Sequence, residues 1–267
     1  MIDHLQEGRS MRTGTVLSLA AAVLCVAPAA SLAAPQPPAD VASAVGQKNR
    51  TADNVKLDAS RKPTEILRYL GLRKGDRVLD LFGGNLYWAE LTAPAVGQAG
   101  HVTIWEPTQF ADAETKTKLD SFVSQHLNVS WVSSPMETPS LEANSFDFAL
   151  INLDYHDVYW TSEKYKISRM QPDAWLKTLY AAMKPGSTVG VIDHVAKTGE
   201  DPRVSVEKMH RIDPAIVSRD FRTAGFVLVG SSPILRNPAD DHTLLVFDPK
   251  IRGKTDRFVY KFRKPAK

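Results

Sequence analysis

The chain has 267 residues, of which 43% are hydrophobic and 24% charged, and its formal net charge is +3. This is the composition of an ordinary globular protein, so collagen-like, coiled-coil and fully disordered chains are excluded. The single cysteine excludes a disulfide scaffold and any zinc or iron–sulfur site built from cysteines. Outside the N-terminus no charge-free apolar run reaches the about 18 residues of a membrane-spanning helix, which excludes a multi-pass membrane protein.

Residues 1–33 have the pattern of a secretory signal peptide. Arg9 and Arg12 form a short basic region, residues 16–26 are apolar, and small residues precede the cleavage site expected after Ala33. A buried N-terminal helix or a membrane anchor is the alternative, but the apolar stretch is short and a proline-rich segment follows it. We therefore predict an exported, periplasmic protein with no stable membrane insertion after cleavage.

The rest of the chain is predicted to form one domain. Residues 34–60 form a polar segment that we expect to be irregular or weakly helical, and residues 61–267 alternate between strand and helix patterns. The predicted strands are residues 77–82, 101–106, 128–133, 146–153, 188–194, 226–231 and 258–262. The predicted helices are residues 63–70, 86–93, 112–125, 172–183 and 214–224. This order predicts an α/β, Rossmann-like, seven-stranded, mostly parallel sheet with helices on both faces and an antiparallel last strand.

Lysine and arginine are concentrated at the C-terminus, where residues 250–267 contain eight of them and one acidic residue. Such a segment can contact phosphates or an anionic surface. Aromatic residues at 258, 260 and 262 alternate with basic ones at 257, 261 and 263, however, so we favour a strand at a solvated edge of the sheet. No nucleic-acid-binding motif accompanies the segment, and we predict no nucleic-acid partner.

Two motifs resemble those of the class I S-adenosylmethionine-dependent methyltransferases. The first is KGDRVLDLFGGN at residues 74–85, and the second is MKPGS at residues 183–187. Further motifs are similar to those of a group of bacterial exported or periplasmic predicted methyltransferases: NLDYHD at residues 152–157, DH at 193–194, HRID at 210–213, NPADD at 237–241 and IRGKTDRFVYKFRKP at 251–265. The resemblance covers residues 57–265, and it implies a Rossmann-like fold with S-adenosyl-L-methionine as the cofactor.

The resemblance also implies which residues bind the cofactor: Asp80, Gly83, Gly84, Glu106 and Asn152. In the family an acid at the position of Asp80 orders the glycine turn, and an acid at that of Glu106 accepts hydrogen bonds from both ribose hydroxyls. Only the middle glycine of the usual acidic-x-Gly-x-Gly-x-Gly pattern is in register, at Gly84. Phe82 and Leu86 replace the outer two, so we expect a narrower pocket or altered backbone angles. An ordinary strand-to-helix turn is the alternative.

A polar cluster follows the predicted strand at residues 146–153. His156 is the candidate general base because its ordinary pKa is about 6.5, and either Asp157 or Asp154 can orient it. His194 ends the next predicted strand and is expected to lie beside His156 as a third catalytic residue. The residues predicted to contact the substrate are Tyr155, Tyr159, Trp160 and His210. A loop whose histidine and aspartates cap the next helix is the alternative.

Together these patterns predict a methyltransferase that acts on a small-molecule substrate. Because the chain is expected to be exported, there is an alternative: a methyltransferase-like binding protein, or a degenerate enzyme without methyl transfer activity. The histidines and aspartates lack the spacing of common metal motifs, so we predict no metal, with a metal-dependent hydrolase as a third alternative. Residues 236–256 are predicted to be either a lid over the strand ends or a surface loop. The sequence defines neither the methyl acceptor nor an oligomeric state.

Overall fold

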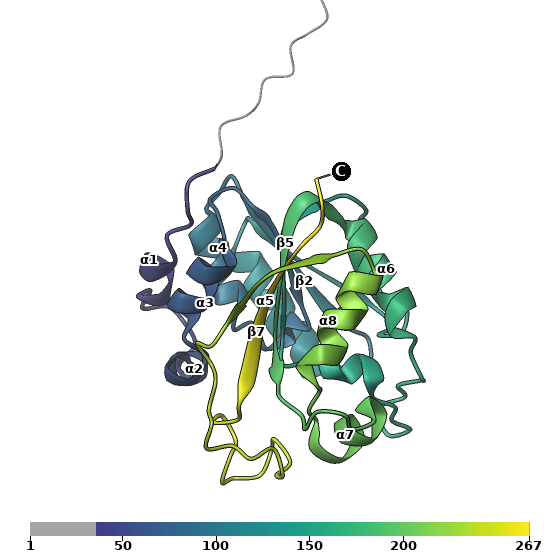
Figure 1. Ribbon diagram of the computed structural model, residues 1–267. Coiled ribbons are helices and arrows are strands. Elements are labelled where there is room, and N and C mark those ends of the chain that lie inside the picture. The colour runs from purple at the N-terminus through teal and green to yellow at the C-terminus, as the bar shows by residue number, and fades with distance from the viewer. Residues whose placement is uncertain (1–35, 267) are drawn as a thin grey trace, which may run out of the picture. The chain divides into compact units, whose positions relative to one another are not determined.

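The computed structural model describes residues 36–266, which contain one seven-stranded sheet (Figure 1). The predicted signal peptide therefore lies outside the described residues. The strands are β1 (Arg77–Leu81), β2 (His101–Pro107), β3 (Val129–Ser134), β4 (Phe146–Asn152), β5 (Met183–His194), β6 (Val227–Ser232) and β7 (Arg257–Arg263). Their order is β3-β2-β1-β4-β5-β7-β6; β1 to β5 are parallel, and β7 is antiparallel to both β5 and β6. The predicted fold class is confirmed.

Helices cover both faces of this sheet. They are α1 (Val41–Val45), α2 (Ala52–Arg61), α3 (Pro63–Leu70), α4 (Ala89–Val96), α5 (Ala113–Gln125), α6 (Pro172–Ala182), α7 (Pro202–Met209) and α8 (Pro214–Thr223), with 3-10 turns η1 (Gly83–Asn85) and η2 (Tyr155–Tyr159). Figure 1 shows α3 and α4 on one side of the sheet and α6 and α8 on the other. Within residues 36–266, no helix combines the length and apolar character needed to cross a bilayer.

Alternating side chains of β1 feed two separate hydrophobic cores. Leu79 and Leu81 pack in the core that contains Trp175 of α6, and Val78 packs in the core that contains Leu67 of α3. A strand buried on both faces is typical of a parallel sheet covered by helices. Because the faces are filled with apolar side chains, polar groups are left to the ends of the strands.

The structure is more regular than predicted before residue 61. Residues 41–61, within and just after the segment expected to be irregular or weakly helical, contain α1 and the ten-residue helix α2. Val41 and Ala44 of α1 are buried in the core with α3 and α4. Arg50 holds α2 through two hydrogen bonds of 2.6 and 2.9 Å to Asp58. Core packing of α1 against α3 and α4, together with this ion pair at α2, stabilises helices that the local sequence pattern does not favour.

The prediction of a solvated edge strand near the C-terminus is wrong. The strand exists as β7, but it lies between β5 and β6, and β6 forms the edge. Phe258 and Phe262 are buried in the core, and the buried Arg257 donates a 2.7 Å hydrogen bond to the Ser60 carbonyl. The connection between β6 and β7 is long enough for β7 to lie between β5 and β6. The alternation of residues within β7 does not reveal this position.

Candidate functional site

The carboxyl ends of β1, β2, β4 and β5 meet at one edge of the sheet. The strand order reverses at β1, whose neighbours are β2 on one side and β4 on the other, and such a switch point is where open α/β sheets bind ligands. A cavity of about 330 Å³ lies at this edge. Its lining residues are Phe82, Gly84, Asn85, Glu106, Phe110, Glu114, Thr115, Lys118 and Asp154. A larger cavity of about 740 Å³ lies at the opposite ends of the strands, beside Asp76 and Asp147, and contains none of the predicted site residues.

The turn after β1 keeps a glycine-type backbone despite its substitutions. Phe82 has φ +59° and Leu86 has φ +65°, both in the left-handed region that glycine adopts without cost. The helix predicted to begin at residue 86 begins instead at Ala89, because η1 and the left-handed Leu86 intervene. The Phe82 ring lies 5.0 Å from that of Trp105, and this packing offsets the backbone strain.

Gly83 and Gly84 make room for two acidic side chains. A Cβ on Gly83 would lie 2.8 Å from Oδ2 of Asp80, and a Cβ on Gly84 would lie 2.6 Å from Oε1 of Glu106. The Gly84 N–H donates a 2.9 Å hydrogen bond to Oε2 of Glu106. The structure therefore brings together four of the five predicted cofactor residues, and the fifth, Asn152, is buried at the end of β4.

Both acidic side chains are poorly solvated. Burial raises the pKa of Asp80 to about 7, with a further contribution from Glu106, and burial raises the pKa of Glu106 to about 7. Oδ2 of Asp80 is buried and has no hydrogen-bond partner. Asp80 is not among the residues that line the cavity, and an unpaired buried acceptor is costly in the free protein.

These raised pKa values predict how stability depends on pH. A carboxyl whose pKa is near 4 when unfolded and about 7 when folded favours folding at low pH, and this contribution is lost as the pH rises towards 7. The double variant Asp80→Asn, Glu106→Gln lacks both titrations. We expect the free energy of unfolding of the variant, minus that of the wild type, to increase as the pH rises. Urea denaturation of both proteins from pH 4.5 to 8 measures this difference. A difference that does not change with pH would contradict this assignment.

Arg61, the last residue of α2, lies near this turn although no motif in the sequence marks it. Its guanidinium carbon lies 4.2 Å from the Tyr87 ring centroid, and Nη1 is buried without a hydrogen-bond partner. Burial lowers the pKa of Arg61, although Tyr87, Asp154 and Asp80 favour its charged form. An arginine at the end of a polar segment gives no local sign of a binding role. Only the fold of α2 brings it beside the glycine turn.

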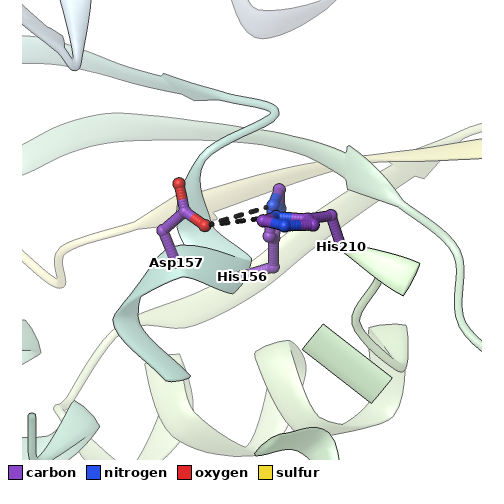
Figure 2. A group of neighbouring side chains, drawn as sticks. All are labelled: His156, Asp157 and His210. Atoms are coloured by element: carbon purple, nitrogen blue, oxygen red, sulfur yellow. Dashed lines mark ion pairs between the residues drawn. The ribbon is translucent and has the colours of Figure 1, made fainter. Parts of the chain in front are cut away.

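A second polar group, formed by His156, Asp157 and His210, lies beyond the ends of β4 and β5 (Figure 2). Turn η2 carries His156 and Asp157, and His210 follows α7. Nδ1 of His156 lies 2.8 Å from Oδ1 of Asp193, and Nε2 lies 3.3 Å from Oδ1 of Asp157. Nδ1 of His210 lies 3.8 Å from the same Asp157 oxygen. Two elements that are distant in sequence thus converge on one carboxylate.

The pKa of His156 differs from the ordinary value of a histidine side chain. Burial lowers its pKa, but Asp193 and Asp157 outweigh that effect and raise it to about 9. His156 therefore holds a proton near neutral pH in the ligand-free protein. His194 lies beside it as predicted, with the ring centroids 6.0 Å apart, and burial keeps the pKa of His194 well below its ordinary value.

The residues predicted to contact the substrate fall into two groups. Tyr155 and Tyr159 are buried, and their hydroxyls donate hydrogen bonds of 3.0 and 2.5 Å to Oδ2 of Asp220 in α8. Tyr155 is fully buried in the core, so its ring does not line a pocket. Trp160 and His210 are less buried, and their ring centroids lie 5.2 Å apart. Of the four predicted substrate residues, Trp160 and His210 are therefore the two that are only partly buried.

Helix α7 (Pro202–Met209) was not predicted, and its C-terminal end determines the position of His210. Asp201 caps α7 by accepting hydrogen bonds from the N–H groups of Arg203 and Val204. His210 follows α7 with φ +50°. Asp213 caps α8 by accepting a 2.8 Å hydrogen bond from the Ala215 N–H.

Solved structures share this fold at low sequence identity. A SAM-dependent methyltransferase from Aquifex aeolicus is 19% identical over 79% of this chain and 99% of its own, with a TM-score of 0.53. An arsenic(III) S-adenosylmethionine methyltransferase from Chlamydomonas reinhardtii is 19% identical over 87% of this chain and 74% of its own (TM-score 0.51). The [4+2]-cyclase SpnF is 15% identical over 88% of each chain (TM-score 0.52). No protein-family model and no curated protein matches the sequence.

Proposed function

We propose that the protein is an S-adenosylmethionine-dependent methyltransferase that acts on a small molecule. One observation carries the proposal: Asp80 and Glu106 lie against the glycine turn, at the switch point of a sheet shared with solved methyltransferases. Fold similarity alone does not define a reaction, as the cyclase with the same architecture illustrates. The proposal therefore also needs residues at the site whose chemistry suits S-adenosylmethionine.

The groups around the turn fit the cofactor. Glu106 ends up beside Gly84, where its carboxylate can accept hydrogen bonds from ribose hydroxyls. The unpaired Asp80 oxygen suits an ammonium donor, and the unpaired Nη1 of Arg61 suits a carboxylate. When bound, S-adenosylmethionine supplies an electrophilic methyl group on a sulfonium centre. The chain's own contribution is to bind and orient this ligand and to exclude water with Phe82 and Phe110, which also line the cavity.

Calorimetric titration with S-adenosylmethionine and S-adenosylhomocysteine tests this function. We expect saturable binding of both at micromolar concentrations. Failure to bind either ligand at millimolar concentrations would contradict the proposal and favour the alternative, a methyltransferase-like protein that binds another ligand.

Arg61 allows a sharper test of how the ligand lies. Arg61→Met should weaken binding of S-adenosylmethionine by about 10- to 100-fold, because a charge-assisted hydrogen bond is worth about 1.5–3 kcal/mol. The same variant should bind 5′-methylthioadenosine, which lacks the amino acid moiety, as the wild type does. The matched control is Arg68→Met, which removes an exposed arginine of α3. Equal losses for both ligands would place Arg61 away from the carboxylate.

We also infer that the protein is exported, on the sequence pattern of residues 1–33 alone. Mass spectrometry of the protein produced in a bacterial host should find a mature chain that begins at Ala34 in the periplasmic fraction. An intact chain recovered only from the cytoplasm would contradict the inference. Export would raise the question of where the protein meets a cofactor made in the cytoplasm.

A further inference from the structure

We propose that His156, Asp157 and His210 form a binding site for one divalent transition-metal ion, with Zn²⁺ as the best-fitting probe. Each residue offers one ligand atom, and these atoms lie within 4.8 Å of one another. Figure 2 shows the two imidazoles and the carboxylate converging from η2 and from the end of α7. The sequence predicted no metal because the histidines are 54 positions apart, whereas the fold brings them together.

The spacing of the atoms fits an ion. Zinc bound at about 2.0–2.2 Å by nitrogen and oxygen in a tetrahedral site leaves its ligand atoms about 3.3–3.5 Å apart. Oδ1 of Asp157 lies 3.3 Å from Nε2 of His156 and 3.8 Å from Nδ1 of His210. The ligand atoms of all three residues lie within 4.8 Å of one another, so side-chain rotation would bring them to bonding distance of one ion.

Asp157 provides a second, independent observation. Asp157 is 8% exposed. Its Oδ1 is buried and has no hydrogen-bond partner, although Nε2 of His156 lies 3.3 Å away. A buried carboxylate oxygen of this kind is destabilising unless a cation or a donor satisfies it. A metal ion bound to Asp157 would provide that interaction.

Asp193 supplies the outer support that metal-binding histidines ordinarily have. It accepts from Nδ1 of His156 at 2.8 Å, and its other oxygen accepts from the His156 backbone N–H at 2.8 Å. The first bond keeps the proton on Nδ1, so a metal ion would bind at Nε2 and displace the proton that this nitrogen carries in the ligand-free protein. Carboxylate–histidine–metal arrangements of this type orient the ring and raise its basicity.

Three protein ligands leave a coordination position for water or for a substrate atom. His210 lies between Trp160 and Phe247, with ring centroids 5.2 and 5.1 Å away. Phe247 is 54% exposed, so the site opens towards solvent beside these two aromatic rings. An oxygen or nitrogen ligand of a small aromatic or apolar molecule fits this setting. The inference does not depend on methyl transfer, because metal binding is measured without cofactor or acceptor.

The test is calorimetric titration of the untagged full chain, first treated with a chelator, with ZnCl₂ alone and with MgCl₂ alone. We expect one Zn²⁺ per chain and no measurable Mg²⁺ binding, since two imidazoles favour a softer ion. Cobalt substitution should give the visible absorption of a low-coordinate N/O site. The absence of Zn²⁺ binding, or equal binding of Mg²⁺, would overturn the proposal.

Variants then locate the ion. His210→Gly removes one ligand at a position where φ is already +50°, so glycine preserves the backbone. Asp157→Asn retains the shape of the side chain. Each should weaken Zn²⁺ binding by more than the about 10- to 100-fold expected for the outer-sphere variant Asp193→Asn. His126→Ala, which removes a histidine of the α5 C-terminus, is the matched control and should leave binding unchanged. Undiminished binding in both ligand variants would overturn the assignment.

Discussion

Glu106→Ala should reduce the affinity for S-adenosylmethionine by at least about 100-fold. The carboxylate is expected to accept hydrogen bonds from two ribose hydroxyls, and each bond to a charged group is worth about 1.5–3 kcal/mol. The side chain is 7% exposed and lies against the glycine turn, so its loss also leaves the Gly84 N–H without its partner. Calorimetric titration of wild type and variant measures the effect.

A general loss of structure must be separated from loss of the ligand contact. Glu65→Ala removes an exposed glutamate of α3 and should bind the cofactor as the wild type does. Circular dichroism should show that Glu106→Ala retains the secondary structure. If the folded variant binds with wild-type affinity, Glu106 does not contact the ribose and the proposed orientation of the ligand fails.

The second large effect is expected on stability. Asp240→Ala should reduce the free energy of unfolding by about 3–5 kcal/mol, because it leaves the Arg211 guanidinium buried without its carboxylate. Arg211 is fully buried and donates hydrogen bonds of 2.8 and 3.1 Å to Asp240. It also donates to the Leu244 carbonyl at 3.0 Å. Urea denaturation of wild type and variant measures the loss.

This buried pair anchors the connection between β6 and β7, which carries Phe247 to the site. Asp240→Ala should therefore also speed proteolytic cleavage within residues 237–256. Glu142→Ala removes a solvent-exposed partner of Arg77 and should change stability by at most about 1 kcal/mol. A loss in Asp240→Ala no larger than that of the control would show that the ion pair does not hold the segment.

Much of the fold was predictable because its signals are local. The buried run at residues 77–82 predicts a strand since its apolar residues face two cores, and Pro214 with Asp213 before it marks a helix start. The two acidic residues of the cofactor site end or nearly end their strands, so the sequence places them at one edge of a parallel sheet. Their meeting at the glycine turn follows from that topology.

What could not be predicted depends on contacts between distant segments. Nothing in the local sequence shows that Phe82 and Leu86 would adopt left-handed angles, because tertiary packing imposes them. The residue pattern of β7 does not show that this strand lies between β5 and β6, because its position depends on the path of the chain between β6 and β7. Arg61 reaches its position through α2, in a segment expected to be irregular or weakly helical, and His210 through α7, a helix that the sequence pattern did not predict.

A crystal structure of the protein with S-adenosylhomocysteine tests the central claim most directly, namely that the cofactor binds at the glycine turn between β1 and β2. We predict that the ribose hydroxyls contact Glu106 and that the amino acid end lies beside Asp80 and Arg61. A ligand bound elsewhere, for example in the cavity beside Asp76 and Asp147, would contradict the claim, as would an empty turn at saturating ligand concentration.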